Sequence, residues 1–131
     1  MIKFFTKYKI IFFLSNFILM LEYLFPGSLL GCIIFNDCKI QPQITANFLI
    51  STNHLYSFLI LSFIGFCTYK NSKYSNVLTK YLLTLSIILE VMHYFIPNRS
   101  FEYQDLFGNL AGVIIIIILF NLFKKYEKIK H

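Results

Sequence analysis

Long apolar runs separated by short polar segments dominate this chain. Four stretches, at about 8–25, 48–69, 77–96 and 105–123, are mostly apolar. Each is close to the roughly 20 residues that a helix needs to cross a membrane. The last contains GVIIIIILF, which is apolar on every side of a helix. Strands are typically about 4–8 residues long, so runs of this length predict four helices.

The composition favours a lipid environment for these helices. Of 131 residues, 57% are hydrophobic and only 14% are charged. A soluble domain of this size has too much surface to hide so many apolar side chains. We therefore predict a single domain, residues 1–131, with the fold class of an all-α membrane protein: a four-helix transmembrane bundle.

The positive charges alternate along the chain. Lys and Arg are frequent at the N-terminus, between the second and third runs, and in the C-terminal tail, whereas the other two connections are nearly neutral. The positive-inside rule then predicts cytoplasmic termini in a multi-pass protein of the cell inner or plasma membrane, with the first and third loops on the extracytoplasmic side. The net charge of +6 is not gathered in one patch. Membrane lipids are therefore the expected partners, and nucleic acid is not.

The N-terminal run also has features of a secretory signal. Basic residues precede it, and Leu29–Cys32 reads LLGC, which is similar to a lipoprotein cleavage box. Asn16 and Glu22 interrupt the apolar run, and the box lies far from the first residue. We therefore expect this span to be retained.

The three cysteines lie in two settings. Cys67 is inside the second predicted span, where it is expected to pack as a small apolar residue. Cys32 and Cys38 share the first outer loop, and the spacing leaves open whether they are oxidised or free. The intervening IIFND predicts a small hairpin with Asn36 and Asp37 at its turn.

Polar residues concentrate where the third run ends and the fourth begins. A carboxylate at the depth of Glu90 costs about 2.5–3.5 kcal/mol on insertion scales, so it calls for a partner or a function. His93 lies on the same helical face, and Arg99 lies on the turn that follows. We predict that Glu90 and Arg99 share one site. The ligand-binding candidates are Glu90, His93, Arg99, Asp105 and Asn109.

Other polar residues near the same level are interpreted as structural or solvated. They are Glu22, Asn53, His54 and Glu102. Gly108 and Gly112 form a small-residue face on the fourth span. Because the connecting turn is short, we expect that face to lie against the third span.

These motifs resemble the VanZ-like family of small bacterial membrane proteins. That family has Glu-x-x-Gln ending a span, then Pro-x-Arg, then Asp-x-x-x-Asn-x-x-Gly opening the next span. The corresponding segments here are Glu90–His93, Pro97–Arg99 and Asp105–Gly112, with His93 in place of the usual Gln. A second family motif, Asp-Lys-x-x-His, matches poorly at Asn53–Ser57. The family is named after a protein linked to resistance to the glycopeptide teicoplanin, so the resemblance implies a role in the cell envelope.

The leading functional prediction is a binding or modulating protein for a lipid-linked or headgroup-like envelope ligand. Arg99 would bind phosphate or carboxylate, and Glu90 and Asn109 would orient the ligand. This prediction involves no cofactor, no metal ion and no assigned catalytic residue. One alternative is a membrane enzyme in which Glu90 and His93 act as acid and base, or bind a metal together with Asp105. The other is a subunit of a larger membrane assembly, with another membrane protein or a second copy of the chain as partner.

Overall fold

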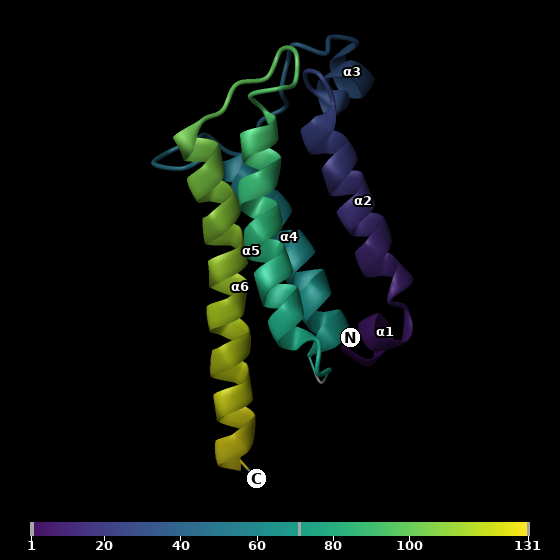
Figure 1. Ribbon diagram of the computed structural model, residues 1–131, viewed down its shortest axis with the longest axis vertical. Coiled ribbons are helices and arrows are strands. Elements are labelled where there is room, and N and C mark those ends of the chain that lie inside the picture. Colours follow the sequence, from purple (N-terminus) through teal and green to yellow (C-terminus); the bar gives the residue numbers. More distant parts are fainter. Residues whose placement is uncertain (1, 71, 131) are drawn as a thin grey trace.

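A computed structural model describes residues 2–70 and 72–130, and every regular element within them is a helix. The helices are α1 (Ile2–Lys7), α2 (Ile10–Leu24), α3 (Leu29–Phe35), α4 (Thr52–Tyr69), α5 (Ser75–Met92) and α6 (Tyr103–Lys130). Figure 1 shows α2, α4, α5 and α6 running lengthwise, while α1 and α3 are short pieces at opposite ends.

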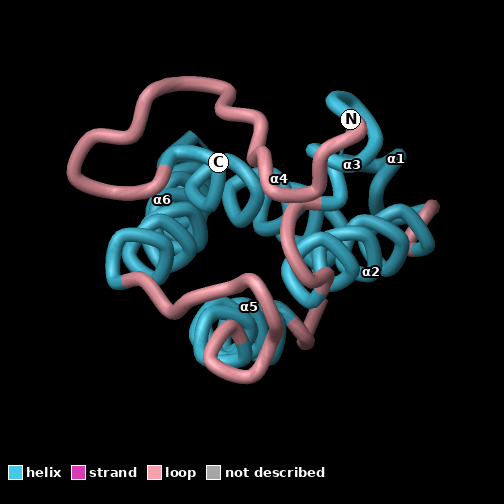
Figure 2. The backbone as a smooth tube through the Cα atoms, turned by 90° about the horizontal axis from the view of Figure 1, so that it is seen from above, coloured by secondary structure: helices cyan, strands magenta, loops and turns pink. Residues whose placement is uncertain are grey.

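Helix α4 lies at the centre of the packing. Its most extensive interface is with α6, and it also contacts α1, α2 and α5. Figure 2 looks down on α2, α4, α5 and α6 from one end. The core side chains come from all four of these helices and include Leu19, Phe58, Leu61, Leu82, Leu89 and Val113.

The two ends of the molecule differ in what they carry. Both termini, the end of α4 and the start of α5 lie toward one end, which we call the basic end because of its lysines (Figure 1). The loops that follow α3 and α5, residues 36–51 and 93–102, lie at the opposite end (Figure 1). We call that the polar end, because the candidate site residues gather there.

Several helices are apolar enough to cross a membrane. By length and composition α5 and α6 qualify, and α2 with α3 qualifies as a third when the bent pair is taken as one span. The axes of α2 and α3 differ by 86°. Large apolar side chains stay exposed along these helices, among them Phe13, Phe17, Ile88, Ile118 and Leu122. Such a surface is typical of a chain whose solvent includes lipid.

The helix boundaries depart from the predicted ones at both ends of the molecule. The second apolar run was expected to be helical from residue 48, but α4 begins at Thr52 and Phe48 is exposed in the loop. The amide of Thr52 donates to Asn47 Oδ1 (3.1 Å), which satisfies one of the free donors at a helix start. Helix α2 ends at Leu24, because Phe25 precedes Pro26 and is extended.

Helix α5 ends four residues before the predicted boundary at 96, at Met92. The amides of Tyr94 and Phe95 bond to carbonyls three residues back, those of Val91 and Met92, so the chain tightens into turns before it reaches Pro97. Helix α6, by contrast, continues through the basic tail to Lys130, beyond the predicted end at 123. Lysine is a good helix former, and hydrophobicity alone therefore underestimates this helix.

The segment between Cys32 and Cys38 does not form the predicted hairpin. Its first three residues, 33–35, belong to α3, which begins after Ser28, whose Oγ accepts the amide of Gly31 (3.0 Å). Asn36 ends the helix in the left-handed conformation, with φ of 53°. This C-cap brings the chain back on itself, and Cys32 and Cys38 form a disulfide. Cys67 is buried in α4, as predicted.

The small-residue face of α6 packs against α4, not against α5 as the sequence suggested. A Cβ on Gly108 would lie 2.6 Å from the carbonyl oxygen of Ser51, and one on Gly112 would lie 2.6 Å from that of Leu55. The short turn between α5 and α6 places these two helices as neighbours but does not determine which face of α6 they share. The two glycines allow the backbones of α4 and α6 to approach closely.

Candidate functional site

Glu90 is the most deeply placed acidic group of the polar end. It is fully buried in the last turns of α5, with 0% exposure. Its Oε1 accepts the backbone amide of Glu102 (3.0 Å) and lies 3.3 Å from His93 Nδ1. Its Oε2 has no hydrogen-bond partner among the residues that the structure describes. One carboxylate oxygen is thus fixed by the following loop, while the other points into the interior.

His54, in the first turn of α4, lies between two carboxylates. Its Nε2 is 4.0 Å from Glu90 Oε2, and its Nδ1 is 3.4 Å from Asp105 Oδ1. Ser51 Oγ also contacts Nδ1, at 2.8 Å. His54, Glu90 and Asp105 each offer one ligand atom within 4.8 Å of the other two, so together they could hold a metal ion.

The sequence-based interpretation treated His54 as structural or solvated, and its burial contradicts only the second of these. The imidazole is buried, and it joins the two acidic residues that were predicted as candidates. A usable signal was its position beside Asn53 at the start of the second apolar run, at the same level as Glu90. Which partner it meets depends on the packing of α4 against α6, and Gly108 makes that approach possible.

Asn109 and Tyr23 join three of the long helices through buried hydrogen bonds. The Tyr23 hydroxyl donates to Asn109 Oδ1 (2.6 Å), and Asn109 Nδ2 donates to the Ser86 carbonyl (3.2 Å). His93 Nε2 lies 3.1 Å from the carbonyl oxygen of Tyr23, and the two rings stack. Tyr23 was not among the candidates, although a tyrosine next to Glu22 in an apolar run was a sign of a polar contact.

Arg99 forms its hydrogen bonds with the end of α2 and not with Glu90. Its Nε donates to the carbonyl oxygen of Phe25 (3.2 Å) and its Nη2 to that of Glu22 (2.8 Å). These are free carbonyls at the C-terminus of α2, where a cation is favoured. Burial lowers the pKa of the Arg99 guanidinium, and nearby acidic groups oppose that shift. An arginine nevertheless stays protonated in a protein.

The predicted Glu90–Arg99 site therefore has two separate parts. Within the described chain, the ion pairs of Glu90 are with His54 and His93, and Arg99 forms none. The reason lies in the turn after α5: it carries Arg99 toward the end of α2, whereas the amide of Glu102 returns to Glu90. Both parts lie at the polar end.

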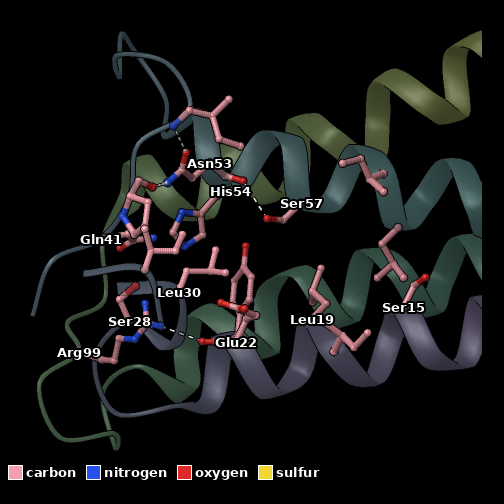
Figure 3. A pocket seen from close by; sticks show the side chains of 17 residues that line it. Ser15, Leu19, Glu22, Ser28, Leu30, Gln41, Asn53, His54, Ser57 and Arg99 are labelled. Atoms are coloured by element: carbon pink, nitrogen blue, oxygen red, sulfur yellow. Dashed lines mark hydrogen bonds between the residues drawn. The ribbon is translucent and has the colours of Figure 1, made fainter. Parts of the chain in front are cut away.

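A cavity of about 510 Å³ lies between α2 and α4, next to Arg99 (Figure 3). Where the cavity reaches the polar end of the molecule, its lining includes Glu22, Ser28, Gln41, Asn53, His54 and Arg99. Farther along the helices the lining becomes apolar, with Ile18, Leu19, Ile60 and Leu61. Figure 3 shows Arg99 and Gln41 at one extreme and Leu19 and Ser15 toward the other. The charged side chains thus lie at one extreme of the cavity, and the rest of the lining is mostly apolar, with Ser57 and Ser15 as polar exceptions.

A second cavity of about 350 Å³ adjoins the first. Ser28, Gln41 and Arg99 line both. The smaller cavity is the more polar of the two, and its lining includes Lys39, His93, Glu102 and Asp105. Of the five sequence candidates, Arg99, His93 and Asp105 therefore reach a cavity, whereas Glu90 and Asn109 are buried behind its wall.

The loop before α4 closes over the larger cavity. Asn53 Nδ2 donates to the Pro42 carbonyl (2.6 Å), and Asn53 Oδ1 accepts the amide of Ile44 (3.1 Å). Pro42 and Ile44 both line the cavity, so Asn53 positions part of its wall (Figure 3). The prediction that Asn53 is structural agrees with these contacts.

Comparisons of the chain with protein-family models, with curated proteins and with solved structures found no match. The resemblance to the VanZ-like family thus stays a prediction that rests on the residues around Glu90, Arg99 and Asp105.

Proposed function

We propose that this chain is a four-span membrane protein of the cell envelope that binds an amphiphile carrying a polar or phosphorylated headgroup. The observation that carries the proposal is the 510 Å³ cavity, whose lining runs from Arg99 at the polar end to Ile60 and Leu61 along the helices. A headgroup would contact Arg99, and a hydrocarbon chain would lie between α2 and α4. Ligand pockets typically occupy about 300–1,000 Å³, and this volume is within that range.

In this proposal α4 is the fourth span, inside a four-helix transmembrane bundle. Unlike α5 and α6, it does not qualify as a span by length and composition alone, and its first turn carries Thr52, Asn53 and His54. Eight of its residues are buried, including Ser62 and Thr68, so much of its surface faces other helices. A helix that faces protein can carry small polar residues which a lipid-facing helix avoids.

The proposed orientation places the basic end in the cytoplasm. Both termini and the start of α5 share that end, which fits the alternation of lysines along the sequence (Figure 1). The polar end then faces the extracytoplasmic side, where the Cys32–Cys38 disulfide would be stable. Membership in the VanZ-like family is part of the proposal, supported by the convergence of Glu90, His93 and Asp105 at this end.

The alternatives receive less support from the geometry. An acid–base role for His93 requires a free ring nitrogen, but one lies 3.3 Å from Glu90 and the other 3.1 Å from the Tyr23 carbonyl. A subunit role was suggested by the small-residue face, and that face is covered by α4 within the chain. Neither contact points to a reaction or to a partner protein.

Lipid retention tests the proposal. The purified chain would be mixed in detergent with phosphatidylglycerol or with a polyprenyl phosphate, and bound lipid would be measured by native mass spectrometry. Ile60 lines the cavity and is 57% exposed, so Ile60→Trp fills the cavity without disturbing the core. Ile88 on α5 is 51% exposed and lines none of the described cavities, which makes Ile88→Trp the matched control.

We expect retention of either lipid to be lost in Ile60→Trp and kept in Ile88→Trp. Arg99→Lys should weaken retention, because lysine lacks the planar fork that binds phosphate through two hydrogen bonds. Equal retention in both tryptophan variants would show that lipid binds elsewhere, on the general apolar surface, and would refute the proposed site.

A further inference from the structure

Three potential metal ligands converge at the polar end from three different helices. They are His54 on α4, Glu90 on α5 and Asp105 on α6, and one ligand atom from each lies within 4.8 Å of the others. Such proximity alone is common among acidic residues. A second observation concerns Glu90: its side chain is fully buried, and its Oε2 has no partner among the described residues. That oxygen lies 4.0 Å from His54 Nε2.

We propose that His54, Glu90 and Asp105 bind a divalent transition-metal ion, with Zn²⁺ as the ion of choice. Imidazole nitrogen and carboxylate oxygen bind Zn²⁺ at about 2.0–2.2 Å, so small side-chain rotations bring all three atoms onto one ion. Two carboxylates and one neutral imidazole carry two negative charges, which a divalent cation balances. Without a cation, two such charges in a poorly hydrated site would be costly.

The surrounding contacts orient the ligands as a metal site requires. Ser51 Oγ contacts Nδ1 of His54, and Nε2 faces Glu90. Asp105 Oδ1 lies 3.4 Å from Nδ1, so its side chain must turn toward Nε2 to share the ion. The amide of Glu102 and Nδ1 of His93 hold Oε1 of Glu90, which leaves Oε2 for the ion. Hydrogen bonds of this kind fix the orientation of metal ligands in proteins. His93, which the sequence suggested as a ligand, supports Glu90 instead.

A bound ion would be reachable from the cavities. His54 lines the larger cavity and Asp105 the smaller one. Three protein ligands leave one position of a four-coordinate Zn²⁺ open. That position could accept water or an oxygen of a phosphate or carboxylate headgroup. The metal site does not require that an amphiphile binds, and the two proposals can fail independently.

Direct titration with Zn²⁺ tests the inference. The full chain, purified in detergent through a tag without histidine, would be stripped with a chelator and titrated by calorimetry, with stoichiometry from native mass spectrometry. Co²⁺ added in place of Zn²⁺ gives a visible spectrum that reports the coordination geometry. We expect one Zn²⁺ per chain.

Isosteric variants identify the ligands. Glu90→Gln and Asp105→Asn should each weaken Zn²⁺ binding by roughly 100-fold or more, since loss of an outer hydrogen-bond partner alone costs about 10–100-fold. Asp37→Asn is the matched control, because Asp37 is an exposed acidic residue of the same end that lies outside the triad and lines neither cavity. If Glu90→Gln does not fold, Asp105→Asn carries the test, as its side chain is 18% exposed.

Two results would overturn the metal site: no stoichiometric Zn²⁺ in the unmodified chain, or unchanged affinity in both isosteric variants. Ile60→Trp separates this proposal from the proposed function. It should abolish lipid retention and leave Zn²⁺ binding intact. A chain that binds Zn²⁺ but no lipid would support the metal site and refute amphiphile binding.

Discussion

The polar and basic ends of this molecule handle charge in different ways. At the polar end Glu90, His93, Asn109 and His54 are buried, and they contact one another or backbone groups contributed by several helices. At the basic end Lys125, Lys128 and Lys130 of the tail are exposed, and Lys124 is half-buried. The buried exception is Lys70, whose Nζ lies 2.6 Å from Oε1 of Glu127, and the side chain of Glu127 is 49% exposed.

The two ends therefore differ in how much the fold depends on their polar contacts. Exposed charges at the basic end keep their hydration, and single surface ion pairs contribute only about 0–1 kcal/mol. Buried polar groups at the polar end are costly unless each finds a partner. The chain has only 14% charged residues, yet it buries an acid, two imidazoles and an amide at one place, so its packing depends on the partners that these groups find there.

The largest expected effect concerns which side of the membrane each end faces. Ser100 and Lys73 are exposed at the polar and basic ends respectively. In a background without the native cysteines, we expect a membrane-impermeant maleimide to label Ser100→Cys in intact cells. Lys73→Cys should react only after permeabilisation, because the reagent cannot cross the bilayer. The reverse pattern would contradict the orientation, and equal labelling of both would contradict four spans.

Next in size is the effect of removing a buried amide. Asn109→Ala should lower the free energy of unfolding by roughly 2–6 kcal/mol, because the Tyr23 hydroxyl and the Ser86 carbonyl both lose a partner, at about 1–3 kcal/mol each. Asn121→Ala is the same substitution on α6 at an exposed position near the basic end. It should change stability by no more than about 0.5 kcal/mol.

Unfolding of the purified protein in detergent, followed by circular dichroism, measures both asparagine variants. If both variants lose similar amounts of stability, the buried Asn109 side chain stabilises the fold no more than the exposed Asn121 side chain does. The contrast between the two ends would then be wrong.

The smallest effect is the coupling between Glu90 and Arg99. Arg99→Lys should cost roughly 1–2 kcal/mol, because lysine cannot bond both the Phe25 and Glu22 carbonyls. Glu90→Gln keeps an oxygen for the Glu102 amide. Since the two side chains share no direct contact, the double variant should equal the sum of the singles within about 0.5 kcal/mol.

A double-mutant cycle in the same unfolding assay measures this coupling. Recovery of stability in the double variant would show a direct Glu90–Arg99 pair, as the sequence suggested, and would merge the two parts of the polar end into one.

Much of the local structure followed from the sequence. The four apolar runs predicted the four long helices, because an apolar segment of that length is satisfied by its own backbone bonds. The clustering of Glu90, His93, Asp105 and Asn109 around one turn was also readable, since a short turn keeps the ends of α5 and α6 adjacent. Pro26 stopped α2 where local backbone geometry requires it.

Tertiary packing decided the rest. The sequence could not show that Gly108 and Gly112 face α4, because a small-residue face accepts any neighbouring helix. That choice brought His54 between Glu90 and Asp105 and turned a residue of low apparent interest into the centre of the site. The position of α2 separated Arg99 from Glu90, since the free carbonyls of α2 lie within reach of the guanidinium. Contacts between residues far apart in sequence depend on how the helices pack against one another. A local sequence pattern does not determine that packing.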